Sequence, residues 1–184
     1  MNEEPLTGKK ALRFPVVSLS AEYLTIGYLM RRNILAYKAP PNNEGYDIIC
    51  IHPDPRKVTK QIRVQVKSRY QSDCNRAVSV RAKSFDAFDY LIVVFLSIGC
   101  FSRRPPKKPA PTEPEFYTLP KEIARAHHRK VKSGFDYIWT DSFDLSPYRN
   151  EAGFQLIADD LEIPLPSALK AAAQPGASPD PAGG

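Results

Sequence analysis

The sequence predicts one α/β domain with a central mixed β-sheet flanked by helices. Short runs rich in β-branched residues, typical of strands, recur between residues 34 and 140. Segments with helical spacing of apolar residues precede and follow these runs. One run, Tyr90 to Ser97, is apolar almost throughout, as expected of a strand covered on both faces. The 184 residues, 42% of them hydrophobic, are enough for one domain with a buried core.

Composition divides the chain into three parts. We expect a flexible N-terminus over residues 1–14, a folded domain over residues 15–163, and a disordered tail rich in Ala, Pro and Gly over residues 164–184. The formal net charge of +6 permits a polyanionic partner. No apolar run is long enough to cross a membrane, and the N-terminus lacks the regions of a signal peptide.

The cysteines indicate a reducing compartment. Cys50, Cys74 and Cys100 are widely spaced and odd in number, which favours free thiols over a disulfide framework or a zinc knuckle. We therefore expect a cytoplasmic protein.

The first predicted element is a helix from Ser18 to Asn33. Ser18 or Ser20 can cap its start, and Arg31 and Arg32 suit the negative end of its dipole. Its apolar stripe consists of Ala21, Leu24, Tyr28 and Leu29. Glu22 lies on or beside that stripe, where it can act as a first-turn acid that complements the dipole or as a functional acid.

Three strands are predicted next. Ile34 to Ala39 is the first, and a loop of punctuating residues, 40–45, separates it from Gly45 to His52. Ile62 to Arg69 is the third. Because side chains alternate along a strand, Gln65 and Lys67 share one face of the third strand. If these last two strands pair as a hairpin, Asp47 can meet Gln65 and Lys67 on that face.

These three side chains have a chemical use. A carboxylate and an amide oxygen are hard ligands of the kind that Mg²⁺ prefers. A lysine on the same face can orient or activate the attacking water and stabilise the charge that develops on a phosphate. The alternative is that they are solvated residues at the edge of an ordinary sheet.

At Asp47 and at Gln65-Val66-Lys67 the chain resembles the PD-(D/E)XK nuclease superfamily, which includes restriction endonucleases and archaeal Holliday-junction resolvases. The chain departs from the family at Gln65, where an acid is usual, and at Tyr46, where proline is usual. The resemblance implies a restriction-endonuclease-like core and Mg²⁺ or Mn²⁺ as cofactor. It also implies that Asp47 and Gln65 bind the metal, that Lys67 is catalytic, and that Glu22 adds an acid to the metal site.

The second half of the chain continues the α/β pattern. An extended stretch at 77–81, a short helix at 83–89 and the apolar strand at 90–97 come first. They are followed by a strand at 115–119, a helix at 120–130, a strand at 135–140 and a closing helix at 150–163. Phe85, Phe88 and Tyr90 are predicted to be core residues.

Two basic segments are candidates for contact with a nucleic-acid backbone. The Pro-rich loop 102–114 carries Arg103, Arg104, Lys107 and Lys108, which can contact phosphates or merely solubilise an insertion. Arg129 and Lys130 make a basic end of the helix predicted at 120–130, which is either a phosphate-contacting surface or a solvated face.

The resemblance implies a metal-dependent endonuclease that hydrolyses phosphodiester bonds in DNA. RNA stays open as a substrate, and a homodimer is compatible with the family. The alternative is a catalytically degenerate module of the same fold that binds nucleic acid or a protein without cleaving. No glycine-rich phosphate loop or nucleophile elbow is present, and nothing points to a nicotinamide, flavin or haem cofactor.

Overall fold

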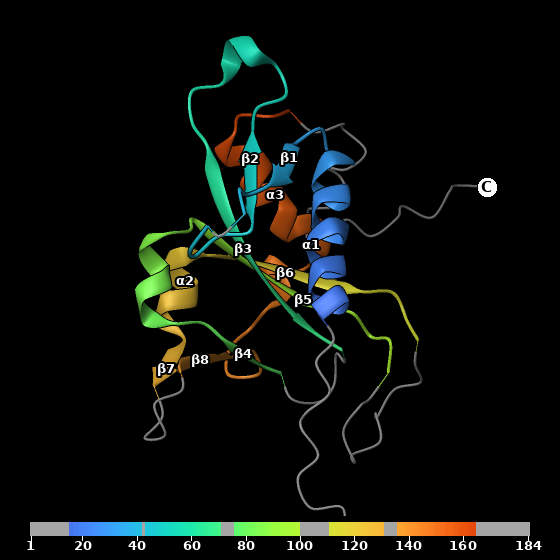
Figure 1. Cartoon of the computed structure of the whole chain (residues 1–184), viewed down its shortest axis with the longest axis vertical. Coiled ribbons are helices and arrows are strands. Elements are labelled where there is room, and N and C mark those ends of the chain that lie inside the picture. Colours follow the sequence, from blue (N-terminus) through green and yellow to red (C-terminus); the bar gives the residue numbers. More distant parts are fainter. Residues whose placement is uncertain (1–14, 42, 71–75, 100–110, 131–135, 165–184) are drawn as a thin grey trace, which may run out of the picture.

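A five-stranded mixed sheet in the order β1-β2-β3-β5-β6 forms the centre of the computed structural model (Figure 1). The structure describes residues 15–41, 43–70, 76–99, 111–130 and 136–164. The strands of this sheet are β1 (Leu35–Lys38), β2 (Ile48–Ile51), β3 (Ile62–Arg69), β5 (Tyr90–Phe95) and β6 (Glu115–Pro120). Neighbouring strands are antiparallel except β3 and β5, which are parallel. The predicted α/β fold with a central mixed sheet is confirmed.

Two helices cover one face of this sheet. They are α1 (Pro15–Met30) and α3 (Asn150–Asp160) (Figure 1). The apolar residues of β3 that face them are Ile62, Val64 and Val66, which alternate along the strand as its sequence predicts. They share a buried core with Ala21 and Leu29 of α1 and with Phe154 and Ile157 of α3.

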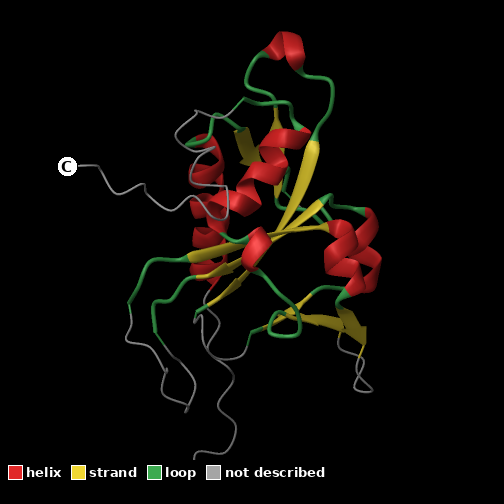
Figure 2. Cartoon of the chain, turned by 180° about the vertical axis from the view of Figure 1, so that it is seen from behind, coloured by secondary structure: helices red, strands yellow, loops and turns green. Residues whose placement is uncertain are grey.

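A second, three-stranded sheet lies beyond the other face, in the order β4-β8-β7 (Figure 2). Its strands are β4 (Ala77–Ser79), β7 (His128–Lys130) and β8 (Asp136–Trp139). Short helical segments accompany it: η2 (Ala82–Asp86), α2 (Lys121–Ala126) and η3 (Ser146–Tyr148). Val78 and Ile138 pack here with the alternate residues of β5, which explains why β5 is buried on both faces. The core assignment of Phe85, Phe88 and Tyr90 is confirmed.

The predicted start of the first helix was wrong. The helix begins at Pro15, where the missing N–H of proline costs nothing, so Ser18 and Ser20 lie inside it. Ser20 donates to the Val17 carbonyl rather than capping the helix. Arg32 follows the last turn and donates to the Tyr28 carbonyl at 2.6 Å, so it does satisfy one of the helix's terminal carbonyls.

The helix predicted over residues 120–130 was also too long. It ends at Ala126, and His128–Lys130 form the edge strand β7 instead. Arg129 pairs with Tyr137 and Lys130 with Asp136 across the β7–β8 ladder. Cross-strand hydrogen bonds therefore outweigh the helical pattern, and Arg129 and Lys130 are exposed residues of a strand rather than a helix end.

Other differences are small. β2 begins at Ile48, so Asp47 precedes the strand, and the short helix expected at 83–89 is the 3₁₀ segment η2. A further short segment of this kind, η1 (Pro55–Lys57), lies in the β2–β3 connection. Within the described ranges, no helix has the length and apolar character that a membrane crossing requires. Both predicted tails, Pro164 apart, lie outside those ranges.

Candidate active site

Strand β3 places Gln65 and Lys67 side by side on the face that looks toward the small sheet. Val64 and Val66 point the opposite way, into the core beneath α1 and α3. Gln65 is buried, and Lys67 is half-buried. The predicted sharing of one strand face by Gln65 and Lys67 is thus observed.

Asp47 lies where β2 begins. Ile48 pairs with Val64, so Asp47 stands opposite Gln65 in the continuing register. Its N–H donates to the Val64 carbonyl at 2.8 Å, and its carboxylate accepts the Val66 N–H at 2.7 Å. No residue of β2 pairs with β3 beyond Val64. The Asp47 side chain therefore supplies the hydrogen bond that a longer β2 would have supplied, and this fixes its carboxylate against the Gln65–Lys67 segment.

Gly45 allows the chain to reach Asp47 in this way. Its φ is +98°, which L side chains rarely adopt, and an added Cβ would collide with the Cβ of Ala87. The backbone thus approaches the end of η2 closely just before Asp47.

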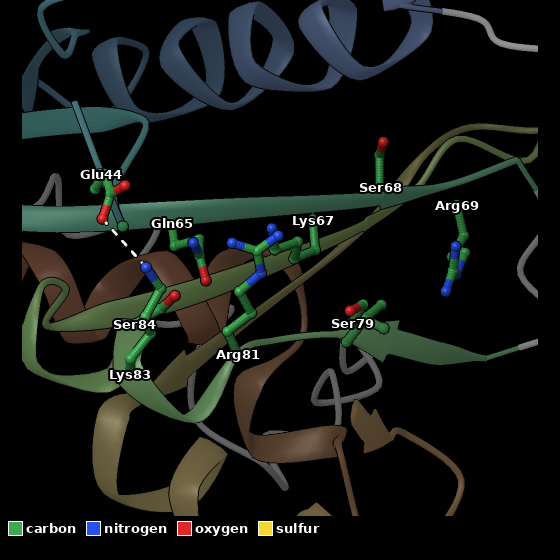
Figure 3. A pocket seen from close by; sticks show the side chains of 11 residues that line it. Glu44, Gln65, Lys67, Ser68, Arg69, Ser79, Arg81, Lys83 and Ser84 are labelled. Carbon is green, nitrogen blue, oxygen red and sulfur yellow. Dashed lines mark hydrogen bonds and ion pairs between the residues drawn. The ribbon is translucent and has the colours of Figure 1, made fainter. Parts of the chain in front are cut away.

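An open hollow of about 450 Å³ lies between β3 and the β4–η2 segment (Figure 3). Gln65 and Lys67 line one wall, and Ser79, Arg81 and Ser84 are on the other. The charged residues around it are Glu44, Lys67, Arg69, Arg81 and Lys83. Four cations against one carboxylate give the hollow a net positive charge, which suits an anionic substrate.

The surroundings of Lys67 lower the pKa of its side chain. Burial lowers the pKa of its ammonium group below the ordinary value, and the negative charge of Asp47 acts in the opposite direction. The positive charges of Arg81 and Arg69 add to the lowering. At a given pH a lowered pKa increases the share of the neutral amine, which is the form that can accept a proton from water.

Arg69 connects the two walls. Its Nε donates to the Ala77 carbonyl at 2.7 Å, and its Nη2 donates to the same oxygen. Burial lowers the pKa of its guanidinium. Arg69 therefore holds β4 beside the end of β3.

The oxygens near Lys67 fit a hard divalent cation. Gln65 is only 7% exposed, and its Oε1 is buried without a hydrogen-bond partner among the described residues. A buried amide oxygen without a partner is costly, and a metal ion would satisfy it. The Asp47 carboxylate, which lies opposite, supplies the negative charge. Among the described residues no group of three His, Cys, Asp or Glu side chains could hold a metal ion. The donor set is thus one carboxylate with neutral oxygens.

Glu22 lies on α1, the helix on the opposite face of the sheet. Its carboxylate forms an ion pair with Lys38 of β1. Lys38 in turn lines a second hollow, of about 710 Å³, together with Tyr23, Tyr37 and Asp47. Among the described residues, Glu22 itself lines neither this second hollow nor the hollow of Gln65 and Lys67, and it is linked to the second one through its ion pair with Lys38. Its predicted role as a metal-site acid stays a prediction.

The predicted nucleic-acid-binding residues do not line the hollow either, as far as the structure describes them. Arg103, Arg104, Lys107 and Lys108 lie outside the described residues. Arg129 and Lys130 are on β7, in the outer strand of the small sheet. Arg81 was missed by the sequence analysis because it belongs to no motif. Arg69 could have been found, since the alternation through Gln65 and Lys67 extends to it.

The fold is similar to that of the bacterial homing endonuclease I-Ssp6803I, with a TM-score of 0.49, 15% identity, and coverage of 88% of this chain and 99% of that one. It is also similar to Hjc, a Holliday junction resolvase from the archaeal hyperthermophile Archaeoglobus fulgidus, with a TM-score of 0.41, 12% identity, and coverage of 82% and 99%. No family model and no curated protein matches the chain. At these identities and TM-scores the likeness concerns the course of the chain and assigns no activity to it.

Proposed function

We propose that the protein is a metal-dependent nuclease of the PD-(D/E)XK type that hydrolyses phosphodiester bonds in DNA. The observation that carries the proposal is that the Val66 N–H holds the Asp47 carboxylate against β3, next to Gln65 and Lys67, which line the cationic hollow. The resemblance at the sequence level had implied these three residues. The proposal is supported by a carboxylate, a buried amide oxygen without a hydrogen-bond partner among the described residues, and a half-buried lysine on this segment.

In this proposal Asp47 is the principal Mg²⁺ ligand, and Gln65 Oε1 with the Val66 carbonyl completes the protein ligands. Bound there, Mg²⁺ would supply Lewis-acid stabilisation of charge on the phosphate oxygens. The hydrogen bond from the Val66 N–H holds the Asp47 carboxylate in place. Glu22 remains a candidate for an additional acid at the same site.

Lys67 has the second role. Its ammonium group lies on the hollow side of β3, next to Gln65, where it can hold the attacking water and stabilise charge on the phosphate. In its neutral form, which the lowered pKa favours relative to an ordinary lysine, Lys67 can instead accept a proton from that water. The cationic hollow keeps the DNA backbone against this side of the sheet.

The test is cleavage of supercoiled plasmid and of branched DNA by the purified full chain, with Mg²⁺, with Mn²⁺ and with a chelator. Lys67→Ala and Asp47→Asn should abolish cleavage while leaving DNA binding largely unchanged. Lys57→Ala is the matched control, because Lys57 is an exposed lysine of η1 outside the hollow, and it should cleave like the wild type.

A second function is favoured by one observation, the neutral Gln65 at a position where the family usually has an acid. In that case the chain binds nucleic acid or a protein partner through the same face without cleaving. Absence of cleavage with either metal, together with DNA binding that weakens as salt rises, would replace the nuclease with this binding module.

A further inference from the structure

Arg81 is a cation without a partner at the centre of the hollow. It precedes η2 as its N-cap residue and is exposed. No hydrogen bond or ion pair joins its side chain to any residue that the structure describes. In Figure 3 its side chain extends from the β4–η2 connection toward β3, and its guanidinium lies between Gln65 and Lys67.

The other cations of the hollow have partners. Lys83 pairs with Glu44 at 3.4 Å, and Arg69 is bound to the Ala77 carbonyl. Lys67 has the negative charge of Asp47 nearby. Arg81 alone among the described cations of the hollow faces it with no compensating acceptor of its own.

The position of Arg81 sets what it can bind. Its backbone belongs to the β4–η2 wall, opposite β3, and its guanidinium reaches toward Lys67, so an anion that enters the hollow meets a cation from each wall (Figure 3). A guanidinium presents its N–H groups as a planar fork that matches two oxygens of one phosphate. A neutral or cationic ligand would leave both charges uncompensated.

We propose that Arg81 is a further catalytic residue, which donates to the nonbridging oxygens of the phosphodiester that is cleaved, opposite Lys67. This inference rests on the proposed nuclease function and adds to it a second source of charge stabilisation from outside the β2–β3 motif. It makes the two walls of the hollow act together on one phosphate group.

The first test measures the contact itself without cleavage. Binding of a fluorescein-labelled DNA duplex to the full chain is followed by anisotropy in chelator over a range of salt concentrations. Loss of one phosphate contact should reduce the slope of log Kd against log salt by about 0.9 in Arg81→Ala. Arg31→Ala removes the same charge from the end of α1, outside the hollow, and should leave the slope unchanged. An unchanged slope in Arg81→Ala would overturn the contact.

The second test asks whether the contacted phosphate is the one that reacts. With saturating protein and Mg²⁺, the single-turnover cleavage rate of Arg81→Ala should fall about 10²-fold. Arg81→Lys keeps the positive charge but loses the paired N–H groups of the guanidinium, so its cleavage rate should lie between those of the wild type and Arg81→Ala. Arg31→Ala should cleave at the wild-type rate. A normal rate at saturation in Arg81→Ala, despite a reduced salt slope, would overturn the catalytic assignment.

Failure of this inference can be told apart from failure of the nuclease proposal. If the wild type does not cleave, the nuclease and the catalytic role of Arg81 both fail, and the salt slope then decides whether Arg81 contacts phosphate in a binding module. If the wild type cleaves and depends on Lys67 but not on Arg81, the nuclease stands and the inference falls. Thermal unfolding of each variant verifies that it is folded.

Discussion

Gln65 is the residue on which the chemistry of the site depends most. A carboxylate at this position would give the site a second negative charge, whereas the amide gives it only an oxygen. That oxygen is buried and without a partner among the described residues, so it costs folding free energy in the absence of a ligand. A ligand that binds this oxygen would offset that cost, as the proposed Mg²⁺ would.

Replacing Gln65 by leucine tests this explanation. Gln65→Leu removes the buried oxygen and keeps a similar volume, so the free energy of unfolding should be unchanged or rise by about 1 kcal/mol. Metal-dependent cleavage should be lost. Urea denaturation and Mg²⁺ titration of the cleavage rate measure the two effects. A clear loss of stability with normal metal dependence would show that Gln65 is structural.

Asp47 has two roles: its negative charge is proposed to bind the metal, and its carboxylate accepts a structural hydrogen bond. Two substitutions test these roles separately. Asp47→Asn keeps an oxygen that can accept the Val66 N–H, so its stability should be close to that of the wild type. Asp47→Ala leaves that N–H without its partner and should lose about 1–2 kcal/mol. Both variants should lose cleavage. Equal stability of the two in chemical denaturation would show that the hydrogen bond contributes nothing.

At the scale of elements, β3 is the strand that the sequence describes best. Its residues alternate between apolar and polar from Ile62 to Lys67, with β-branched residues on the buried face, and its limits, Ile62 to Arg69, could be predicted. For the small sheet, the sequence predicted extended segments at 77–81 and 135–140, which contain β4 and β8, but it predicted neither β7 nor the pairing of these strands. β4 and β7 have only three residues each, which is too short for a periodic pattern, and β4 pairs with β8 across a long stretch of chain. The assembly of this wall beside β3, and with it the approach of Arg81 to Gln65 and Lys67, could therefore not be predicted from the sequence.

The junction between β3 and β5 contains an ion pair with a predictable pH dependence. Asp89 accepts the Arg63 N–H at 2.8 Å and a guanidinium N–H at 2.9 Å. Burial acts to raise the pKa of Asp89, but the hydrogen bonds from Arg63 outweigh it and leave that pKa below the ordinary value. Folding is therefore stabilised by the ionised form above about pH 4, and this contribution is lost as the pH falls through the folded-state pKa.

Asp89→Asn should accordingly lower the free energy of unfolding by about 1–2 kcal/mol at neutral pH, since both groups are partly exposed. The difference from the wild type should shrink as the pH falls below about 3. Asp86→Asn is the matched control, because its pair with Arg125 is exposed and should contribute little. Denaturation curves at both pH values measure the effect, and a deficit of equal size at both would contradict it.

At the scale of the whole molecule, α3 closes the core against β6 through a glycine. A Cβ added at Gly153 would collide with the backbone carbonyl of Tyr148, which cannot move as a flexible side chain would. Gly153→Ala should therefore destabilise the protein by about 2 kcal/mol. Gly27→Ala, on the exposed side of α1 with nothing within 4 Å, should instead stabilise it by about 0.5–1 kcal/mol. Thermal or urea unfolding measures the stability of both variants. An equal loss of unfolding free energy in Gly27→Ala and Gly153→Ala would contradict the steric explanation.

The overall fold could be predicted further than its site. The order of a helix, three antiparallel strands and a buried parallel strand follows from local patterns of burial that survive in the sequence. Residues such as Asp47 and Lys67 were found because they belong to those patterns. Contacts between distant segments are not encoded in such local patterns. They include the ion pair of Glu22 with Lys38 and the pairing of Arg129 and Lys130 with β8.

The division of the hollow between two sheets has a consequence for how such a protein can change in evolution. The motif residues lie on or beside β3 of the central sheet, whereas Arg81 and its neighbours belong to a wall in which β4 pairs with β8, more than fifty residues later in the chain. Insertions or replacements in that wall would reshape the mouth of the hollow and leave Asp47, Gln65 and Lys67 in place. In the proposed nuclease, changes in this wall could thus alter which DNA enters the hollow, and through Arg81 the rate of cleavage, while the motif residues of the central sheet are inherited unchanged.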